Sequence, residues 1–516
     1  MIDRQASSTL LGRLYTQSYK ITNQVLKQFE PDNLDLSSTL NSINVHPGAI
    51  FDEISELESL SLLIYKRLTE LASHLDPMYC IPVLIEIFSG LYGQDEKYEG
   101  NTAFVGSKVL ISFIWTGTYS GNLGRSRSYK DIVEGIKMAM LFLKIEQAKN
   151  VWKLVGEGQV EIREDGVFAT ESLAIHIHHF NRLGPNEYKV LKDATDQLWF
   201  HPENIYKVEK ILTGKVRNGD RLFGDTFLSE IPFTETNFWT ALYCKLRIYI
   251  IIGKERSLVA GKQLTGLCLL TEKALLINEK SGNFLNLANQ LNFWEPTWHN
   301  NAINGTPNEI KRMIIHRPVI GVYNPQSVFA TSIPLLWDSV NFLLEDFVHS
   351  RAGNKIYERF FSGPFEKATI NLFEQYGFKG GEVNDKSIWR TKIPEKLLSP
   401  DRIPGQIDIL AVSEEYHVIV IADCKMVHFP FELNAARNIL AKFGSADDER
   451  FFRKLNMKTD WLSTCSNFKL EEYVVVKMLI TNLDIPLSKD EDRLVLSIRE
   501  VEEKLLKKLK KSGDDY

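Results

Sequence analysis

The chain has 516 residues, of which 44% are hydrophobic and 25% are charged, and its formal net charge is −5. A chain of this length exceeds one ordinary hydrophobic core, so we expect about two to four domains, and the composition excludes extended disorder. The acidic balance excludes a general attraction for phosphate, so any contact with nucleic acid requires a local basic patch.

Apolar runs and cysteines indicate the compartment. No apolar run approaches the ~20 residues that a membrane-spanning helix needs, and the first twenty residues lack the apolar stretch of a signal peptide. The five cysteines are scattered and form no Cys-x-x-Cys pair, which favours free thiols and no structural zinc. We therefore expect a cytoplasmic protein without membrane contact.

Residues 1–150 are predicted to form a helical N-terminal domain. The segment 51–75 places apolar residues at helical spacing, among them Ile54, Leu57 and Leu60, and such spacing is typical of a helix with one buried face.

Residues 151–350 are predicted to form a mixed, mainly helical region. Turn residues and periodicity indicate two hairpins and two helices in it, at 159–169, 236–252, 318–332 and 333–350. Asp165-Gly166 and Asn324-Pro325 are the turn residues expected in the two hairpins.

Residues 351–516 change to an alternation of helices and strands. The expected elements are a helix at 363–376, a strand at 381–390, a hairpin at 405–425, helices at 431–443 and 447–467, and strands at 473–481 and 493–498. This αβββαβ order, with continuous apolar strands, predicts a mixed sheet covered by helices on both faces. The fold class expected for the whole chain is therefore multi-domain α+β or α/β, with a mostly helical N-terminal region.

The hairpin at 405–425 carries charged residues on strands that look buried. Residues two apart on a strand point to one face, so Asp423 and Lys425 are neighbours and Cys424 points the other way. With the turn centred near 415–416, Asp408 is expected opposite Asp423, with Cβ atoms about 4.5–5.5 Å apart.

Two carboxylates this close repel each other unless a cation lies between them. Lys425 supplies one positive charge, and a divalent metal would supply the rest. Oxygen ligands without thiolate or imidazole suit Mg²⁺ or Mn²⁺, bound by Asp408, Asp423 and the backbone carbonyl of Cys424. A metal-bound water positioned by Lys425 suits phosphodiester hydrolysis.

The pattern resembles the PD-(D/E)XK superfamily of restriction-endonuclease-like nucleases. The matching pieces are the helix "GPFEKATINLFEQYG" (363–377), "GQID" (405–408) and "IADCK" (421–425). The resemblance implies that Asp408 and Asp423 bind metal and that Lys425 assists the water. The literal Pro-Asp is absent, because Asp408 follows Ile407, and Asp rather than the commoner Glu stands at 423.

The resemblance also implies an acidic residue on the preceding helix, for which Glu366 is the candidate. The alternative is that Gly363 caps this helix and Glu366 stands at its third position, where an acidic residue is favoured for capping alone. Gln406 lies two residues before Asp408, on the same face, and is expected to support it.

A purely structural alternative exists for the hairpin charges. Asp423 and Lys425 would then form an ion pair at the rim of the sheet, and Asp408 would cap a turn. The cost of burying unpaired carboxylates argues against this alternative if the strands are central.

Basic residues follow the hairpin, and in the family this helical region flanks the nucleic-acid cleft. The residues expected to contact phosphates are Arg437, Lys442, Arg453 and Lys454. The alternative is a solvated amphipathic helix whose charge is balanced by the acidic run 447–449.

The expected activity is therefore Mg²⁺- or Mn²⁺-dependent hydrolysis of DNA by an endonuclease, in a setting typical of prokaryotic antiviral defence or restriction. The alternatives left open are a non-catalytic module that binds nucleic acid or a partner protein, and a nuclease that acts on RNA. A homodimer or a partner bound through the N-terminal region is also expected.

Overall fold

The computed structural model describes residues 34–91, 103–119, 124–156, 158–169, 185–201, 203–216, 226–258, 266–271, 319–322, 328–384, 403–428, 450–465, 469–485 and 494–509, with shorter stretches inside 13–29, 220–224 and 437–443. The chain divides into two compact units. Unit 1 comprises residues 1–149, 159–170 and 191–351, and unit 2 comprises residues 150–158, 171–190 and 352–516. The three-domain division expected from the sequence stays a prediction.

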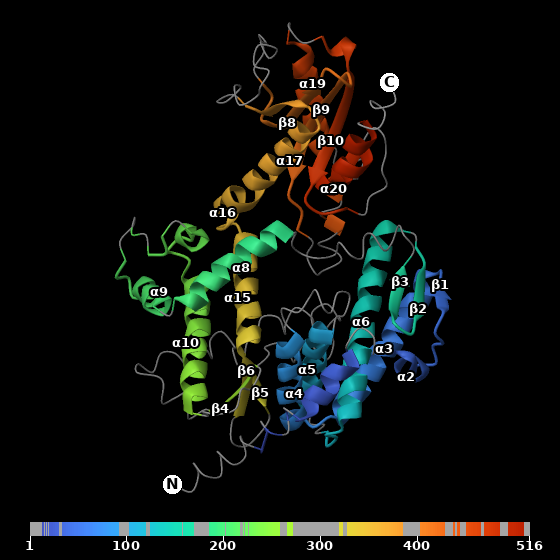
Figure 1. Cartoon of the computed structure of the whole chain (residues 1–516), viewed down its shortest axis with the longest axis vertical. Helices are drawn as coiled ribbons and strands as arrows, with labels where there is room; N and C mark the ends of the chain where they lie inside the picture. Colours follow the sequence, from blue (N-terminus) through green and yellow to red (C-terminus); the bar gives the residue numbers. More distant parts are fainter. Residues whose placement is uncertain are drawn as a thin grey trace. The chain divides into compact units, whose positions relative to one another are not determined.

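Unit 1 is built mainly from helices, as expected for residues 1–150 (Figure 1). Its helices, two of which extend into segments of unit 2, are α2 (Ser37–Asn41), α3 (Ile54–His74), α4 (Pro77–Leu91), α5 (Ala103–Tyr119), α6 (Tyr129–Val155), α8 (Pro185–Phe200), α9 (Asn204–Leu212), α10 (Thr236–Leu258) and α15 (Ile333–Val348), with short 3-10 turns at η1 (Lys27–Phe29) and η3 (Phe227–Glu230). The predicted face of α3 is buried, since Leu57, Leu60 and Leu68 are almost inaccessible to solvent.

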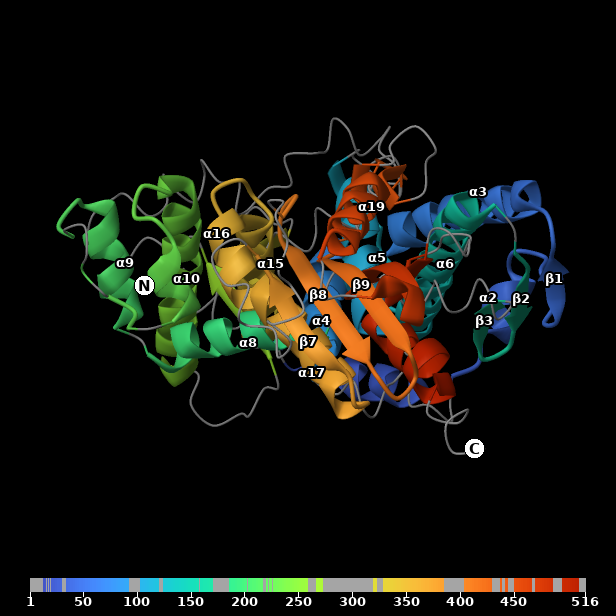
Figure 2. The same cartoon turned by 90° about the horizontal axis from the view of Figure 1, so that it is seen from above.

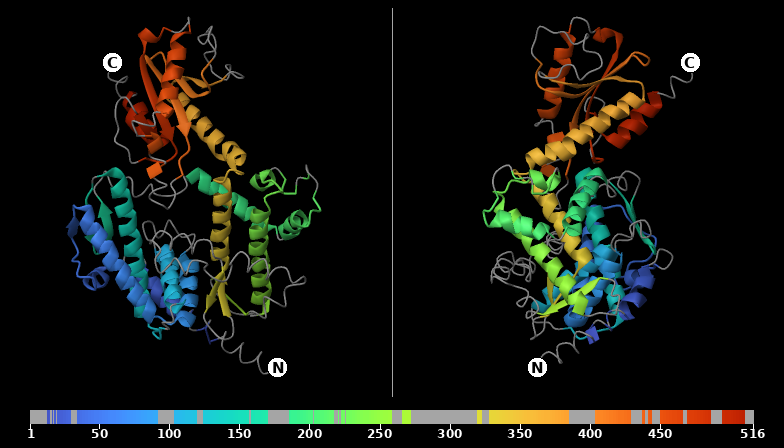
Figure 3. Two further views of the ribbon diagram at one scale, coloured as in Figure 1. Left: turned by 180° about the vertical axis from the view of Figure 1, so that it is seen from behind. Right: turned by 60° about the vertical axis from the view of Figure 1, so that its left-hand side comes forward.

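Two small antiparallel sheets complete unit 1. One has the order β1-β2-β3, from β1 (Ala49–Phe51), β2 (Val160–Arg163) and β3 (Gly166–Ala169), and the other has the order β4-β6-β5, from β4 (Leu267–Thr271), β5 (Val319–Val322) and β6 (Val328–Ser332). Figure 3 shows β4 and β6 beside the ends of α10 and α15, against which they pack. Both predicted hairpins are confirmed, although the bend at Asn324-Pro325 lies outside the described residues.

Unit 2 contains one five-stranded sheet of mixed direction. Its order is β11-β10-β9-β8-β7, from β7 (Lys379–Val383), β8 (Ile407–Ser413), β9 (Val418–Lys425), β10 (Val474–Thr481) and β11 (Leu494–Ser497). The pairs β7–β8 and β8–β9 are antiparallel, and the pairs β9–β10 and β10–β11 are parallel. Figure 2 labels β7, β8 and β9, which are neighbours in this sheet. The expected mixed sheet is therefore confirmed, and β9 lies in its centre.

Helices cover both faces of this sheet (Figure 3). On one face α19 (Arg450–Ser463) packs Phe452 and Leu455 against Leu410 and Ile421. On the other face α17 (Gly363–Gln375) packs beside α20 (Ile498–Glu500) and the π-helical turn η8 (Val501–Leu506). Because both faces are buried, β8 and β9 are apolar without alternation, as parallel and central strands usually are.

The helix before the sheet begins earlier than the sequence indicated. Helical backbone runs through α16 (Asn354–Tyr357) and the π-helical turn η4 (Glu358–Ser362) directly into α17. The backbone N–H of Gly363 donates to Glu358 O, five residues back. This wider turn lets Pro364, which has no N–H to donate, continue a helix that a proline would otherwise kink or break.

Among the described residues, no helix has the length and apolar character needed to cross a membrane. All five cysteines lie in the described part of the chain, where they are buried and form no disulfide.

Candidate functional site

The register of β8 and β9 places two carboxylates opposite each other. Ile409 pairs with Ala422 and Ser413 with Val418, and the same register continued by one residue pairs Asp408 with Asp423. The turn between the strands spans residues 414–417. The predicted opposition of Asp408 and Asp423 therefore follows from the observed turn.

Both carboxylates are buried on the face of the sheet that α19 covers. Asp408 is 8% exposed and Asp423 is 4% exposed. Cys424, between Asp423 and Lys425, belongs to the core on the opposite face. The expected split of these three side chains between two faces is thus observed.

Asp408 is held by two hydrogen bonds. The backbone N–H of Cys424 donates to Asp408 Oδ2 at 2.9 Å, and Gln406 Nε2 donates to Asp408 Oδ1 at 3.2 Å. Gln406 thus supports Asp408 as the sequence predicted. Asp408 caps no turn, because its partner lies on the neighbouring strand, so this part of the structural alternative is wrong.

Lys425 bridges the two carboxylates. Its Nζ lies 3.7 Å from Asp408 Oδ2 and 3.6 Å from Asp423 Oδ2, and it donates to the backbone carbonyl of Cys424 at 3.2 Å. The ammonium also lies 5.6 Å from the centre of the Phe451 ring, a distance that allows a cation–π attraction. The ion pair between Asp423 and Lys425 is therefore present, within a larger cluster.

Lys458 was not among the predicted site residues. It projects from α19 with 5% of its surface exposed, and its Nζ donates to Asp423 Oδ1 at 2.5 Å. The sequence does contain a signal for a buried role of Lys458. The residues three before and four after it, Leu455 and Leu462, are apolar and lie on the same face of α19. A lysine on a buried helix face requires a buried partner.

Glu366, on α17, belongs to the same electrostatic environment. Burial, followed by the negative charges of Asp408 and Glu382, raises the pKa of Glu366 to about 7. The helical backbone upstream of Gly363 shows that the helix does not start there, so the capping alternative for Glu366 is wrong. Glu366 is thus close enough to Asp408 to be affected by its charge, and its role in a metal site stays a prediction.

Glu382 was also not predicted. It lies where the register of β7 against β8 shifts between Gly381 and Val383. Such an irregularity re-aims one side chain of a strand, and the Asn384 amide donates to the Glu382 carboxylate. A pair of glycines before Glu382 is the only sequence signal for this shift, and Gly380 has a φ of 150°.

The cluster holds more negative than positive groups. Burial and the Asp423 carboxylate raise the pKa of Asp408, which Lys425 and Lys458 oppose. Glu366, Asp408 and the charged groups that act on them include five carboxylates and two ammonium groups. The carboxylates are Glu358, Glu366, Glu382, Asp408 and Asp423, and the ammonium groups are Lys425 and Lys458. The excess of carboxylates over ammonium groups offers the oxygen donors that a hard divalent cation such as Mg²⁺ prefers.

The carboxylates of Glu366, Asp408 and Asp423 do not all point to one position. In the described part of the chain, Glu366, Asp408 and Asp423 do not form a set whose ligand oxygens all lie within 4.8 Å of one another. The ammonium groups of Lys425 and Lys458 stand at the oxygens of Asp423 instead.

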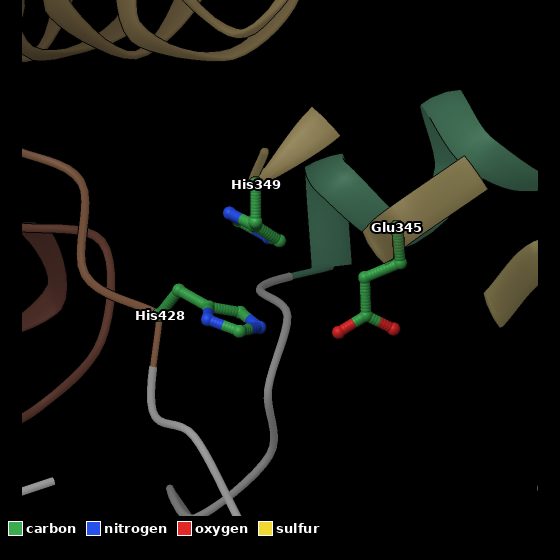
Figure 4. A group of neighbouring side chains, drawn as sticks. All are labelled: Glu345, His349 and His428. Carbon is green, nitrogen blue, oxygen red and sulfur yellow. The ribbon is translucent and has the colours of Figure 1, made fainter. Parts of the chain in front are cut away.

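Figure 4 draws another acidic and histidine group. Glu345 lies on α15 of unit 1, and His349 caps the C-terminus of the same helix, its backbone N–H donating to Glu345 O. His428 follows β9 in unit 2 and belongs to that unit. Glu345 and His349 alone supply two ligands, fewer than the three or four protein ligands of zinc sites, so no metal site is assigned to them.

The predicted phosphate-contacting residues are exposed. Arg437, Lys442, Arg453 and Lys454 all lie at the surface of unit 2. Arg453 and Lys454 follow Phe452 on the outer side of α19 and form no ion pair with a described residue. The acidic run 447–449, proposed as their counter-charge, lies outside the described residues.

No protein-family model, curated protein or solved structure matches this chain.

Proposed function

We propose that unit 2 is a metal-dependent nuclease domain of the PD-(D/E)XK type, which hydrolyses DNA phosphodiester bonds. The observation that carries the proposal is the buried pair Asp408 and Asp423, with Lys425 Nζ 3.7 and 3.6 Å from their oxygens. The order of Glu366, Asp408, Asp423 and Lys425 along the chain supports it, because it follows the order of the family motifs.

The residues present fit a divalent cation. Asp408, Asp423 and the backbone carbonyl of Cys424 would hold Mg²⁺ or Mn²⁺, because they offer oxygen ligands in a cluster with surplus negative charge. When bound, the metal would polarise a phosphoryl oxygen and lower the pKa of a water ligand. Glu366, whose pKa is raised by burial to about 7, would complete the acidic set.

The protein residues have separate roles in this proposal. Gln406 and the Cys424 N–H hold the Asp408 carboxylate in one orientation. Lys425, restrained by the Cys424 carbonyl and the Phe451 ring, places one positive charge beside the attacking water and the scissile phosphate.

Basic residues on the same unit would hold the substrate. Arg453 and Lys454 on α19, with Arg437 and Lys442, are exposed side chains suited to phosphate contacts. We propose DNA as the substrate and antiviral defence or restriction as the setting, on the strength of the family resemblance alone.

One observation favours a second function. Lys458 neutralises Asp423 directly at 2.5 Å, as would be expected of a site that has lost its metal. A non-catalytic module that binds nucleic acid or a partner is therefore the alternative, and it predicts that no divalent cation binds near Asp423.

The test is cleavage of DNA by the full chain. With Mg²⁺ we expect nicking or cutting of plasmid DNA, and Asp423→Asn and Lys425→Ala should each reduce the rate by at least about 100-fold. Asp460→Asn is the matched control, because Asp460 is an exposed carboxylate on α19. Undiminished activity in both site variants would refute the assignment.

A substrate panel separates the remaining alternatives. Duplex DNA, single-stranded DNA and RNA of one sequence are compared at equal concentration. Cleavage of RNA in preference to both DNA forms would replace the DNA proposal with an RNA-directed nuclease.

A further inference from the structure

The buried lysine of α19 has a partner that the proposed metal also requires. Lys458 Nζ donates to Asp423 Oδ1, and the side chains of Lys458 and Asp423 are only 6% and 5% exposed. Asp423 Oδ2 lies 3.6 Å from Lys425 Nζ. Both oxygens of this carboxylate are therefore next to an ammonium group.

Lys458 is placed there by packing as well as by charge. Leu455, Trp461 and Leu462 on the same helix are buried in the core against the sheet, so the Lys458 side chain enters that core with them. Among the described residues, Asp423 is the carboxylate with which Lys458 forms an ion pair. A buried ammonium group without such a partner is costly, so the ion pair with Asp423 offsets the burial of Lys458.

A divalent cation bound by Asp423 would share the carboxylate with the ammonium group of Lys458, which carries a charge of the same sign. Cations held by one buried carboxylate repel each other strongly, because the interior screens them less than water does. We infer that Lys458 is an internal counter-cation that competes with the metal for Asp423, so that metal entry requires this ammonium to withdraw. The inference rests on the proposed metal-dependent function, and it assigns to α19 a gating role at that site.

The competition has a measurable consequence without any cleavage assay. A neutral side chain at 458 removes the competing charge, so Mn²⁺ should bind more tightly to the variant than to the unmodified chain. Lys458→Met keeps the length and apolar stem of the lysine. Lys355→Met is the matched control, because it removes the same charge from an exposed site of unit 2, on α16.

The experiment is calorimetric titration of the full chain with Mn²⁺ at pH 7.5. We expect Lys458→Met to tighten Mn²⁺ binding by about tenfold or more, within the usual range of coupling between two sites. Lys355→Met should leave the affinity within about twofold. Lys458→Gln, which retains an N–H donor for Asp423, should change the affinity in the same direction and serves if Lys458→Met does not fold.

The outcomes separate this inference from the proposed function. If the unmodified chain binds Mn²⁺ and the position-458 variants bind it equally or more weakly, the competition is refuted and the metal site stands. If neither the unmodified chain nor a folded variant binds Mn²⁺, the metal site itself is refuted, and the inference with it.

Discussion

Two groups of buried charges, one in each unit, are arranged differently. In unit 1, Lys108 pairs with Asp338 and Lys149 pairs with Glu146, so that each ammonium group meets one carboxylate. In unit 2, two ammonium groups, those of Lys425 and Lys458, stand against the larger number of carboxylates around Asp408 and Glu366. The matched pairs need nothing further for charge balance, whereas the unmatched cluster leaves negative charge that a bound cation would neutralise.

The matched pairs are expected to be purely structural. Lys108, on α5, is 5% exposed and lies over the Phe88 ring while it pairs with Asp338 on α15. Asp338→Asn leaves this lysine buried without its counter-charge, and we expect the free energy of unfolding to fall by about 3 kcal/mol. Chemical denaturation measures the change, and an unchanged stability would show that this pair does not hold the helices together.

The unmatched cluster should respond in the opposite direction. Asp408→Asn removes a carboxylate whose pKa is raised by burial and by Asp423, while the amide oxygen can still accept from the Cys424 N–H. We expect the metal-free protein to gain about 1 kcal/mol of stability at pH 7. A loss of stability as large as that of Asp338→Asn would remove the distinction between the units.

Much of unit 2 could be predicted because its signals are local. The turn at 414–417 and the two-residue period of strands fix the opposition of Asp408 and Asp423 once the hairpin is recognised. Lys458 could not be assigned in this way, because its partner lies 35 residues earlier and a lysine on a helix is ordinarily solvated. The bond between Lys108 and Asp338 spans 230 residues, beyond any pattern in the sequence.

Two features that the sequence did not predict have physical causes. Gly363-Pro364 is a typical helix start, yet helical backbone continues across it, because the Gly363 N–H donates to Glu358 O in the π-helical turn η4. Glu382 stands next to the cluster because of a shift in register, and such a shift depends on how β7 meets β8 and not on the strand's own residues.

The pH dependence of stability offers a smaller test. The pKa of Glu366 is raised from 4.5 to about 7. Between these two pH values the folded chain holds a proton on Glu366 that the unfolded chain has lost. The associated stability is fully present below pH 4.5 and is lost as the pH rises through about 7.

Glu366→Gln keeps a neutral side chain at every pH and provides the comparison. We expect the unmodified chain to lose stability relative to this variant between pH 5 and 8, by on the order of 1 kcal/mol once solvent screening is allowed for. Thermal unfolding at several pH values measures the difference. Parallel curves of stability against pH for the two proteins would show that burial and the charges of Asp408 and Glu382 do not raise the pKa of Glu366.

The most direct test of the central claim is whether the surplus charge of unit 2 binds a divalent cation at Asp408 and Asp423. Mn²⁺ is titrated into the full chain and into the double variant Asp408→Asn/Asp423→Asn, and bound Mn²⁺ is followed by electron paramagnetic resonance. We expect one saturable site in the unmodified chain that the double variant lacks. Equal Mn²⁺ binding by the two proteins, or none by either, would contradict the account.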